Sequence, residues 1–233
     1  MVEKADRSLR EVSLFRDVPE TSLRRIEARC LWRTLQPGEQ IIDHKDTSRD
    51  VFFLVAGRAR VIIYSVEGQA VAFRELVPGD VFGELSAIDG RARSASVEAR
   101  STCLIASMSP QAFHDAIAEE GQLALALATH LVTQIRELTD RVFEFSTLAV
   151  KNRIHAELLR LARRAEPAGK EAALCPPPTH AEIASRISTH REAVSRELSR
   201  LAQIGLLRRQ GSALLVTDVE RLASMVREAV GDE

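Results

Sequence analysis

Glu84 and Arg93 are the two side chains in this sequence whose types and spacing best suit chemistry. Glu84 lies in "FGEL" and Arg93 in "RARSA", with Gly83 and Ser94 beside them. A guanidinium binds a phosphate through parallel N–H donors, a serine hydroxyl adds another donor, and a carboxylate accepts from a sugar hydroxyl. Glycine lets backbone N–H groups approach an anion closely. These residue types together suit the phosphate and ribose of a nucleotide.

A surface salt bridge is the simpler explanation for such a pair, since exposed ion pairs are common and contribute little to stability. The segment between the two charges argues against it, because it is made largely of small residues that leave room for a ligand. They are Ser86, Ala87, Gly90 and Ala92. The run from Phe82 to Ala99 otherwise alternates like a strand, so we expect a strand-and-turn segment that holds an anion.

A second set of polar side chains occurs in "THREAVSRELSR". Four of them fall at i, i+1, i+4 and i+5, on one side of a predicted helix. Arginine can bind guanine O6 and N7, and glutamate can accept from the amino group of cytosine, so the set suits the DNA major groove. The alternative is an exposed helix stabilised by i,i+4 charge pairs. The four residues are Arg191, Glu192, Ser195 and Arg196.

Positive charge is concentrated in the C-terminal third. Residues 151–216 contain twelve lysines and arginines against six acids, whereas the whole chain has a net charge of −1. Such segregation is typical of a part that meets a polyanion, although it also occurs on ordinary solvated surfaces. We expect four further arginines to contact DNA phosphates without reading bases. They are Arg186, Arg200, Arg208 and Arg209.

Two changes of hydrophobic period divide the chain. Residues 7–31 have helical spacing interrupted by Pro19, which predicts a short helical lead-in. From Trp32 to Met108, short β-rich runs alternate with turn signals such as "PGE", "EGQ", "PGD" and "DG". Short strands separated by glycine turns are typical of a jelly-roll sandwich or barrel.

The second change follows Pro110, where apolar residues begin to step by alternating four and three positions. The pattern continues for more than three heptads without proline or glycine, which favours a coiled-coil stripe over a helix packed on its own barrel. We expect this stripe to pair two copies of the chain. Its positions are Ala124, Ala128, Leu131, Ile135, Leu138, Val142, Phe145 and Ala149.

Three S/T-x-x-E patterns predict capping boxes at helix starts in the last part of the chain. They are Thr179 with Glu182, Thr189 with Glu192, and Thr217 with Glu220. The first two boxes lie ten residues apart, which is helix-turn-helix spacing. "LLRRQGSALLV" predicts a β-hairpin, or wing, and the proline-rich "EPAGKEAALCPPP" upstream is expected to be a linker after a helix that starts near Val150.

These residues and elements resemble the cyclic-AMP receptor protein/FNR family of bacterial transcription regulators. The resemblance covers nearly the whole chain. It implies an α+β fold with an N-terminal β jelly-roll cyclic-nucleotide-binding domain, a long dimerisation helix and a C-terminal winged helix-turn-helix domain. We predict these domains at residues 1–122, 123–149 and 150–233.

The same resemblance implies roles for the first set of residues. Glu84 would hold the ribose 2′-hydroxyl, Arg93 and Ser94 the cyclic phosphate, and the amides around Gly83 to Leu85 would complete the cradle.

Relatives contact adenine through hydroxyls on the dimer helix. The matching positions here are Leu138 and Thr139. Because one hydroxyl is missing and unmatched polar groups set the selectivity of such pockets, the base stays open. Cyclic AMP is favoured and cyclic GMP comes next.

For DNA, the resemblance implies that the four polar residues of this predicted helix, Arg191, Glu192, Ser195 and Arg196, read a TGTGA-like half-site on a near-palindromic operator. Ser188 occupies a turn position where relatives commonly have glycine, so this turn is expected to differ slightly. The implied partners are double-stranded DNA, a second copy of the chain and RNA polymerase, in the cytoplasm. A hinge between the two halves is predicted near Ser146 to Lys151.

Several alternatives remain. The same fold could respond to a cyclic dinucleotide or act without a ligand. A haem or redox sensor is disfavoured by three isolated cysteines and six scattered histidines, and a cupin-type enzyme by a single histidine, His44, in the β-rich section. We therefore expect no enzyme, no metal and no covalent cofactor. No signal peptide or membrane span is expected either.

Overall fold

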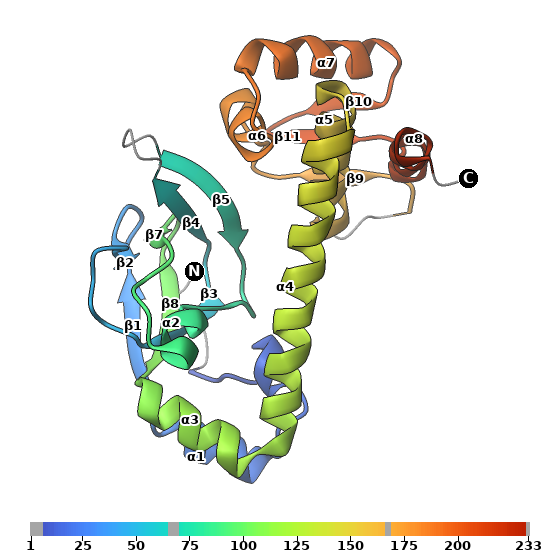
Figure 1. Ribbon diagram of the computed structural model, residues 1–233. Helices are drawn as coiled ribbons and strands as arrows, with labels where there is room; N and C mark the ends of the chain where they lie inside the picture. Colours follow the sequence, from blue (N-terminus) through green and yellow to red (C-terminus); the bar gives the residue numbers. More distant parts are fainter. Residues whose placement is uncertain (1–6, 65–69, 166–168, 232–233) are drawn as a thin grey trace. The chain divides into compact units, whose positions relative to one another are not determined.

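The computed structural model describes residues 7–64, 70–165 and 169–231 (Figure 1). The chain separates into two units, Met1–Ile135 and Arg136–Glu233, and the boundary falls inside one long helix, α4 (Gly121–Thr147). The division into residues 1–122, 123–149 and 150–233 stays a proposal. Each unit is described by itself below.

Short antiparallel strands form two four-stranded sheets in the N-terminal unit (Figure 1), which confirms the predicted jelly-roll sandwich. One sheet has the order β1-β8-β3-β6 and the other β2-β7-β4-β5. The strands are β1 (Leu31–Leu35), β2 (Gln40–Ile42), β3 (Val51–Ala56), β4 (Ala59–Tyr64), β5 (Ala70–Leu76), β6 (Val81–Phe82), β7 (Ser96–Ala99) and β8 (Cys103–Met108).

Strand β3 shows how alternation builds the core, because successive side chains point to opposite faces of a sheet. Phe52 and Leu54 face the apolar cluster that includes the inner residues of the second sheet. Phe53 faces the other way, where its ring meets Phe15 edge-on at 5.0 Å between centroids. Phe15 belongs to the lead-in, so the sheet has apolar contacts on both faces.

The lead-in is helical only in part. A short 3₁₀ turn, η1 (Ser13–Phe15), precedes Pro19, and the helix α1 (Glu20–Glu27) begins directly after it. Proline preorganises a helix start but cannot continue a preceding helix, which explains the interruption.

The segment after β6 differs from the prediction made from the sequence. The sequence predicts a strand-and-turn segment within Phe82–Ala99, but Glu84–Asp89 form a short helix, α2. Gly83 and Gly90 flank it, both with left-handed backbone (φ 78° and 71°). These two conformations turn the chain into and out of a helical turn, and the strand resumes only at β7.

Helix α3 (Pro110–Glu119) leads into α4. The hydroxyl of Ser109 caps α3 by accepting from the N–H of Ala112. The first turns of α4 bury Leu123 and Leu127 in the core of the N-terminal unit. The predicted long helix is therefore confirmed, and its amino-terminal part is anchored to the sandwich.

The C-terminal unit contains the end of α4, four further helices and a three-stranded sheet among its described residues, with sheet order β10-β11-β9. Its core joins apolar residues of α5, the helix pair α6–α7 and the sheet. The elements are α5 (Val150–Arg164), β9 (Ala172–Leu174), α6 (His180–Arg186), α7 (Arg191–Gln203), β10 (Leu207–Gln210), β11 (Ala213–Val216) and α8 (Val219–Val230).

The helix-turn-helix and the wing are confirmed, with Leu207 paired to Val216 at the base of the hairpin. The first three residues of the expected linker, 166–168, lie outside the described residues, and in the described remainder β9 pairs antiparallel with β11. Apolar Ala172 and Leu174 are buried there and Ala173 is exposed, so this short alternation is enough to add a third strand.

One of the three predicted capping boxes is present. Thr179 accepts from the N–H of Glu182 at 3.1 Å, and the Glu182 carboxylate accepts from the N–H of Thr179 at 2.8 Å. The box at Thr217 is wrong, because Asp218 caps α8 by accepting from the N–H of Arg221. The Thr217 hydroxyl instead donates to the carbonyl of Gly205 at 2.7 Å.

The box at Thr189 is also wrong. Helix α7 starts one residue later than predicted, with His190 as its N-cap and no side-chain cap. The N–H of Thr189 donates to the carbonyl of Ala184 within the turn. Ser188 precedes it with φ 51°, a left-handed backbone that costs a residue other than glycine roughly 1–2 kcal/mol. The turn therefore keeps the conformation a glycine would adopt.

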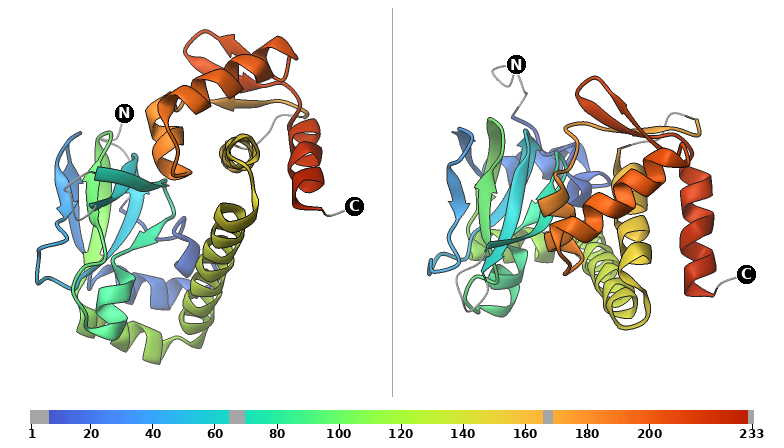
Figure 2. Two further views of the ribbon diagram at one scale, coloured as in Figure 1. Left: turned by 45° about the horizontal axis from the view of Figure 1, so that its top comes forward. Right: turned by 90° about the horizontal axis from the view of Figure 1, so that it is seen from above.

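Between α4 and α5 the helix breaks at Leu148 and Ala149, where the chain changes direction (Figure 2). Ala149, the last predicted heptad position, is the N-cap of α5 and lies outside the long helix. None of the helices in the described part of the chain is long and apolar enough to span a bilayer.

Candidate functional site

Gly83 and Arg93 meet closely beside the short helix α2. A Cβ added at Gly83 would lie 2.8 Å from Nη1 of Arg93 and 2.9 Å from the carbonyl oxygen of Asp50. Real Cβ atoms essentially never approach that closely, and the φ of 78° is also unfavourable for other residues. Glycine is therefore required here by the arginine as well as by the turn.

The guanidinium of Arg93 is buried, with 6% of the residue exposed. Nη1 donates to the carbonyl of Gly83 at 3.0 Å, and Nη2 donates to the carbonyl of Asp50 at 2.9 Å and to the hydroxyl of Ser48 at 3.3 Å. The group also lies over the Phe52 ring, 5.6 Å from its centroid. These contacts hold a cation in place inside the fold.

The same guanidinium is incompletely satisfied. An arginine has five N–H donors, and Nε of Arg93 is buried without a hydrogen-bond partner. Burial lowers the pKa of Arg93, and the charges of Asp50, Asp46 and Glu84 partly offset this effect. A buried cation with an unused donor is suited to an incoming anion.

Glu84 is also buried, with 4% exposed, and begins α2 directly after Gly83. Its Oε1 accepts a hydrogen bond from Nε2 of Gln134, on α4, at 3.3 Å. A carboxylate has several acceptor positions, so this contact leaves room for a further donor. The structure brings Gly83, Glu84 and Arg93 together, as the sequence predicted.

Three other residues predicted for the nucleotide site are exposed rather than buried. Ser94 and Leu85 are exposed, Leu85 by 45%. Thr139 is exposed on the part of α4 that belongs to the C-terminal unit. Their roles toward a ligand stay predictions.

Sequence reasoning missed three residues of this site. Ser48 and Asp50 come from the loop between β2 and β3 and contact Arg93. Gln134 contacts Glu84 across fifty positions of sequence. The loop contacts use a backbone carbonyl and a common hydroxyl, which leave no sequence signal. Gln134 is a polar residue directly beside the heptad stripe and half-buried between exposed neighbours, which is a weak signal.

The second candidate site is the amino-terminal half of α7. Arg191, Glu192 and Arg196 are exposed, and Ser195 is half-buried beside them. No ion pair between Glu192 and Arg196 forms in this part of the described chain. The simpler explanation, a charge-paired surface helix, is therefore not supported by this geometry.

The four arginines expected to contact phosphates differ in how available their charges are. Arg208 and Arg209 are exposed on β10 of the wing. Arg200 is tied to Glu197 at 2.6 Å, although its side chain stays 45% exposed. The expectation for Arg186 is wrong, because it is buried and donates to the buried carboxylate of Glu157 at 3.1 Å. The charge of Arg186 is therefore already paired inside the unit and is not available to a DNA phosphate.

A buried polar pair lies behind the exposed face of α7. Nε2 of His155, on α5, bonds Oε1 of Glu197, which also accepts from Arg200. Burial lowers the pKa of His155, against the opposing effect of Glu197. Burial raises the pKa of Glu197, but the bonds from Arg200 and His155 outweigh it and leave that pKa lowered. At neutral pH the histidine is neutral and donates to an ionised glutamate.

The two units correspond to two known domain families. Residues 32–120, which contain both sheets and the Glu84–Arg93 segment, match the cyclic nucleotide-binding domain. Residues 152–225, which contain α6, α7 and the wing, match the Crp-like helix-turn-helix domain. The chain belongs to the cyclic-AMP receptor protein/FNR family. This family member is a transcription regulator with a cyclic-nucleotide-binding domain and a DNA-binding helix-turn-helix.

Relatives of this family member extend over most of its length. The CRP-like cAMP-activated global transcriptional regulator of Mycobacterium tuberculosis is 26% identical over 204 residues, 85% of this chain and 91% of the relative. The cAMP-activated global transcriptional regulator Vfr of Pseudomonas aeruginosa is 26% identical over 202 residues, which are 83% of this chain and 92% of the relative. The solved structure of the c-di-GMP responsive global regulator CLP of Xanthomonas campestris shares the fold, with a TM-score of 0.70 and 18% identity. The match covers 85% of this chain and 99% of CLP.

Proposed function

We propose that the protein is a cyclic-AMP-responsive homodimeric regulator that binds near-palindromic promoter DNA through α7. The observation that supports this proposal most is the buried Arg93, which has an unused Nε–H donor next to Gly83 and the buried Glu84. Arg74 and Arg153 also have a buried Nε without a hydrogen-bond partner among the described residues, so the donor of Arg93 counts for its place beside Gly83 and Glu84, where an anion would satisfy it.

The residues present fit a cyclic nucleotide. Arg93 donates to the cyclic phosphate from inside the fold, and Ser94, exposed beside it, adds a hydroxyl donor. Glu84 accepts from the ribose 2′-hydroxyl with the acceptor positions that Gln134 leaves open. The backbone amides around Gly83 to Leu85 complete the cradle of donors around the phosphate.

The base is the finer part of the proposal. Thr139 supplies one hydroxyl and Leu138 none, so the hydrogen bonds that separate adenine from guanine are reduced. Cyclic AMP is preferred because curated relatives of similar length are named as activated by it. Cyclic GMP ranks second, and a cyclic dinucleotide is tested because a solved relative is described as responsive to c-di-GMP.

Dimerisation through α4 is supported by the apolar side chains that this helix leaves exposed. Ile135 is 61% exposed, Val142 64% and Leu138 46%. These positions follow the predicted heptad stripe, and burying the exposed part of each would contribute roughly 1–2 kcal/mol. A second copy supplying the same stripe gives a two-fold dimer whose α7 helices face half-sites about 34 Å apart.

The nucleotide then acts by favouring the dimer form that holds the two α7 helices at the correct separation. Such coupling requires a differential affinity for the two forms, typically about 1–3 kcal/mol. The base edges of a TGTGA-like half-site are contacted by Arg191, Glu192, Ser195 and Arg196. The regulator acts in the cytoplasm, and its protein partner at the promoter is RNA polymerase.

The experiment is calorimetry of the full-length protein with cyclic AMP, cyclic GMP and cyclic di-GMP. Arg93→Ala should abolish binding of the preferred nucleotide. Arg91→Ala is the matched control, because its side chain lies two positions away, is 87% exposed and should leave affinity unchanged. Wild-type affinity in Arg93→Ala overturns the phosphate assignment. Tighter binding of cyclic GMP or cyclic di-GMP replaces cyclic AMP as the effector.

The second measurement is operator affinity with and without saturating nucleotide, together with the molar mass by light scattering. We expect a dimer whose DNA affinity rises with nucleotide. Equal DNA affinity in both states overturns allosteric control, and a monomer at micromolar concentration overturns pairing through α4.

A further inference from the structure

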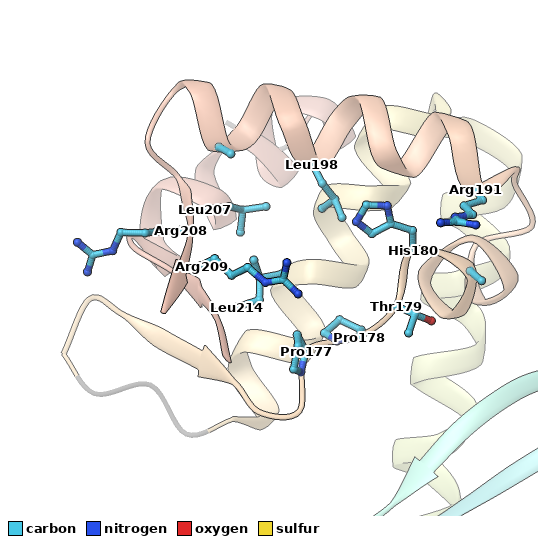
Figure 3. A pocket seen from close by; sticks show the side chains of 12 residues that line it. Pro177, Pro178, Thr179, His180, Arg191, Leu198, Leu207, Arg208, Arg209 and Leu214 are labelled. Carbon is cyan, nitrogen blue, oxygen red and sulfur yellow. The ribbon is translucent and has the colours of Figure 1, made fainter. Parts of the chain in front are cut away.

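A hollow of about 680 Å³ lies between α7 and the β10–β11 hairpin in the C-terminal unit (Figure 3). This volume falls within the range of roughly 300–1,000 Å³ that small-molecule sites occupy. The walls are mainly apolar. They are formed by Pro177, Pro178, Leu198, Ala202, Leu207 and Leu214.

The rim of the hollow is positively charged. Arg191, Arg208 and Arg209 also line it, whereas no aspartate or glutamate does. Among the described residues none of these three arginines makes an ion pair or a side-chain hydrogen bond. Figure 3 shows Arg209 extending toward the middle of the hollow, while Arg208, its neighbour on β10, points away.

Unpaired cations next to an apolar wall select a particular ligand chemistry. An anion satisfies the guanidinium donors, and a hydrocarbon part removes leucine and proline surface from water. A DNA strand offers the anion but only a polar, hydrated sugar-phosphate chain for the apolar wall. The pocket is therefore better matched to a small molecule that has both parts.

We propose that this hollow binds a small amphipathic carboxylate, with its hydrocarbon chain between α7 and the hairpin and its carboxylate on Arg209. Leu198 and Leu214 would cover the chain from opposite sides, one on the helix and one on the sheet. Nothing in this binding requires a nucleotide or DNA.

Binding has a consequence for regulation that rests on the proposed function. Arg191 lines the hollow and is also the first predicted base-reading residue of α7. A carboxylate bound here would neutralise part of the positive charge that the proposed function assigns to DNA contact. The ligand should therefore lower operator affinity.

The test is calorimetry of the full-length protein with sodium octanoate, without DNA or nucleotide. Arg209→Gln should weaken octanoate binding by at least about tenfold, because it removes a charge-assisted hydrogen bond. Arg163→Gln is the control, because Arg163 is exposed on α5 and does not line the hollow, so it should change affinity less than about twofold. Acetate and 1-octanol, which each have only one of the two parts, should bind far more weakly than octanoate.

A second variant tests the hollow itself. Ala202 is exposed, so Ala202→Phe should fill the space without unfolding the unit, as thermal unfolding will check. We expect it to abolish octanoate binding. The proposal is overturned if octanoate gives no heat at millimolar concentration, if both arginine variants lose affinity equally, or if 1-octanol or acetate binds as well as octanoate. It is also overturned if Ala202→Phe weakens DNA binding while wild-type protein ignores octanoate, since DNA would then occupy the hollow.

Discussion

Arg160 on α5 donates to both carboxylate oxygens of Glu144 on α4, at 2.7 and 3.0 Å, across the break between the two helices. Arg160 also bonds Glu157 at 3.0 Å, and Glu157 accepts from Arg186 of α6. The predicted hinge region does contain a helix break, at Leu148 and Ala149. The break is nevertheless bridged by charges, so the end of α4 is tied to the first helix of the DNA-binding pair.

Glu144→Gln should loosen this tie. It removes the charge from a partly buried bidentate pair and should lower the free energy of unfolding of the C-terminal unit by about 1–2 kcal/mol. Hydrogen exchange at the N–H of Leu148, which bonds the carbonyl of Glu144, should accelerate. Glu137→Gln is the control, because its pair with Arg164 is 3.7 Å long and exposed and should contribute little. Equal effects of the two variants would contradict a specific role for Glu144.

Gly83→Ala should damage the nucleotide site more than its backbone strain alone predicts. The new Cβ would lie 2.8 Å from Arg93 Nη1, so the guanidinium must shift, and affinity should fall more than about tenfold. Gly90→Ala isolates the strain. Its φ is also positive, but the nearest atom would be 3.7 Å away, so it should cost roughly 1–2 kcal/mol of stability and leave affinity nearly unchanged. Calorimetry and urea unfolding of both variants measure the difference.

Gln134→Leu should lower stability while sparing nucleotide affinity. It leaves the buried Glu84 carboxylate without the bond from Gln134, at a cost of about 1–3 kcal/mol. Because the other acceptor positions of Glu84 remain, we expect nucleotide affinity within about threefold of wild type. The exposed neighbour Thr133 provides the control, Thr133→Ala. A large loss of affinity in Gln134→Leu would mean that Gln134 itself contacts the nucleotide.

Stability should depend on pH through His155. Burial lowers its pKa in the folded protein below the ordinary value of 6.5, so the unfolded chain binds the proton more readily. The stability that the neutral His155 contributes is fully present above about pH 6.5. It is lost as the pH falls through the lowered pKa of the folded protein. His155→Gln should flatten the fall in unfolding free energy below pH 6.5, whereas His190→Gln, an exposed histidine, should not. An unchanged slope in His155→Gln would refute this assignment.

Arg191→Ala and Arg208→Ala should fail in different ways on DNA. Loss of a base contact by Arg191 should remove sequence preference, by roughly 1–3 kcal/mol of discrimination. Loss of a phosphate contact by Arg208 should weaken binding to all sequences and reduce the salt dependence. Competition binding with operator and scrambled duplexes at several salt concentrations separates the two. Unchanged selectivity in Arg191→Ala would count against the groove assignment.

Local patterns in the sequence determined the elements and the chemical types at the sites. Glycine turns and short apolar runs specified the strands, the heptad stripe specified α4, and Thr179 with Glu182 specified the start of α6. Such signals depend on residues close together in the chain, so they survive without tertiary context. The pairing of Gly83, Glu84 and Arg93 was also visible, because all three lie within one short segment.

Tertiary structure decided which charges are available and which are already used. Arg186 and Arg208 look alike in sequence, yet Arg186 is buried on Glu157 and Arg208 is exposed on the wing. The partners of Arg93 and Glu84 come from a distant loop and from α4, and the hollow beside Arg209 exists only where a helix and a hairpin meet. Burial and pairing arise from contacts between residues far apart in the chain, so a linear pattern contains no record of them.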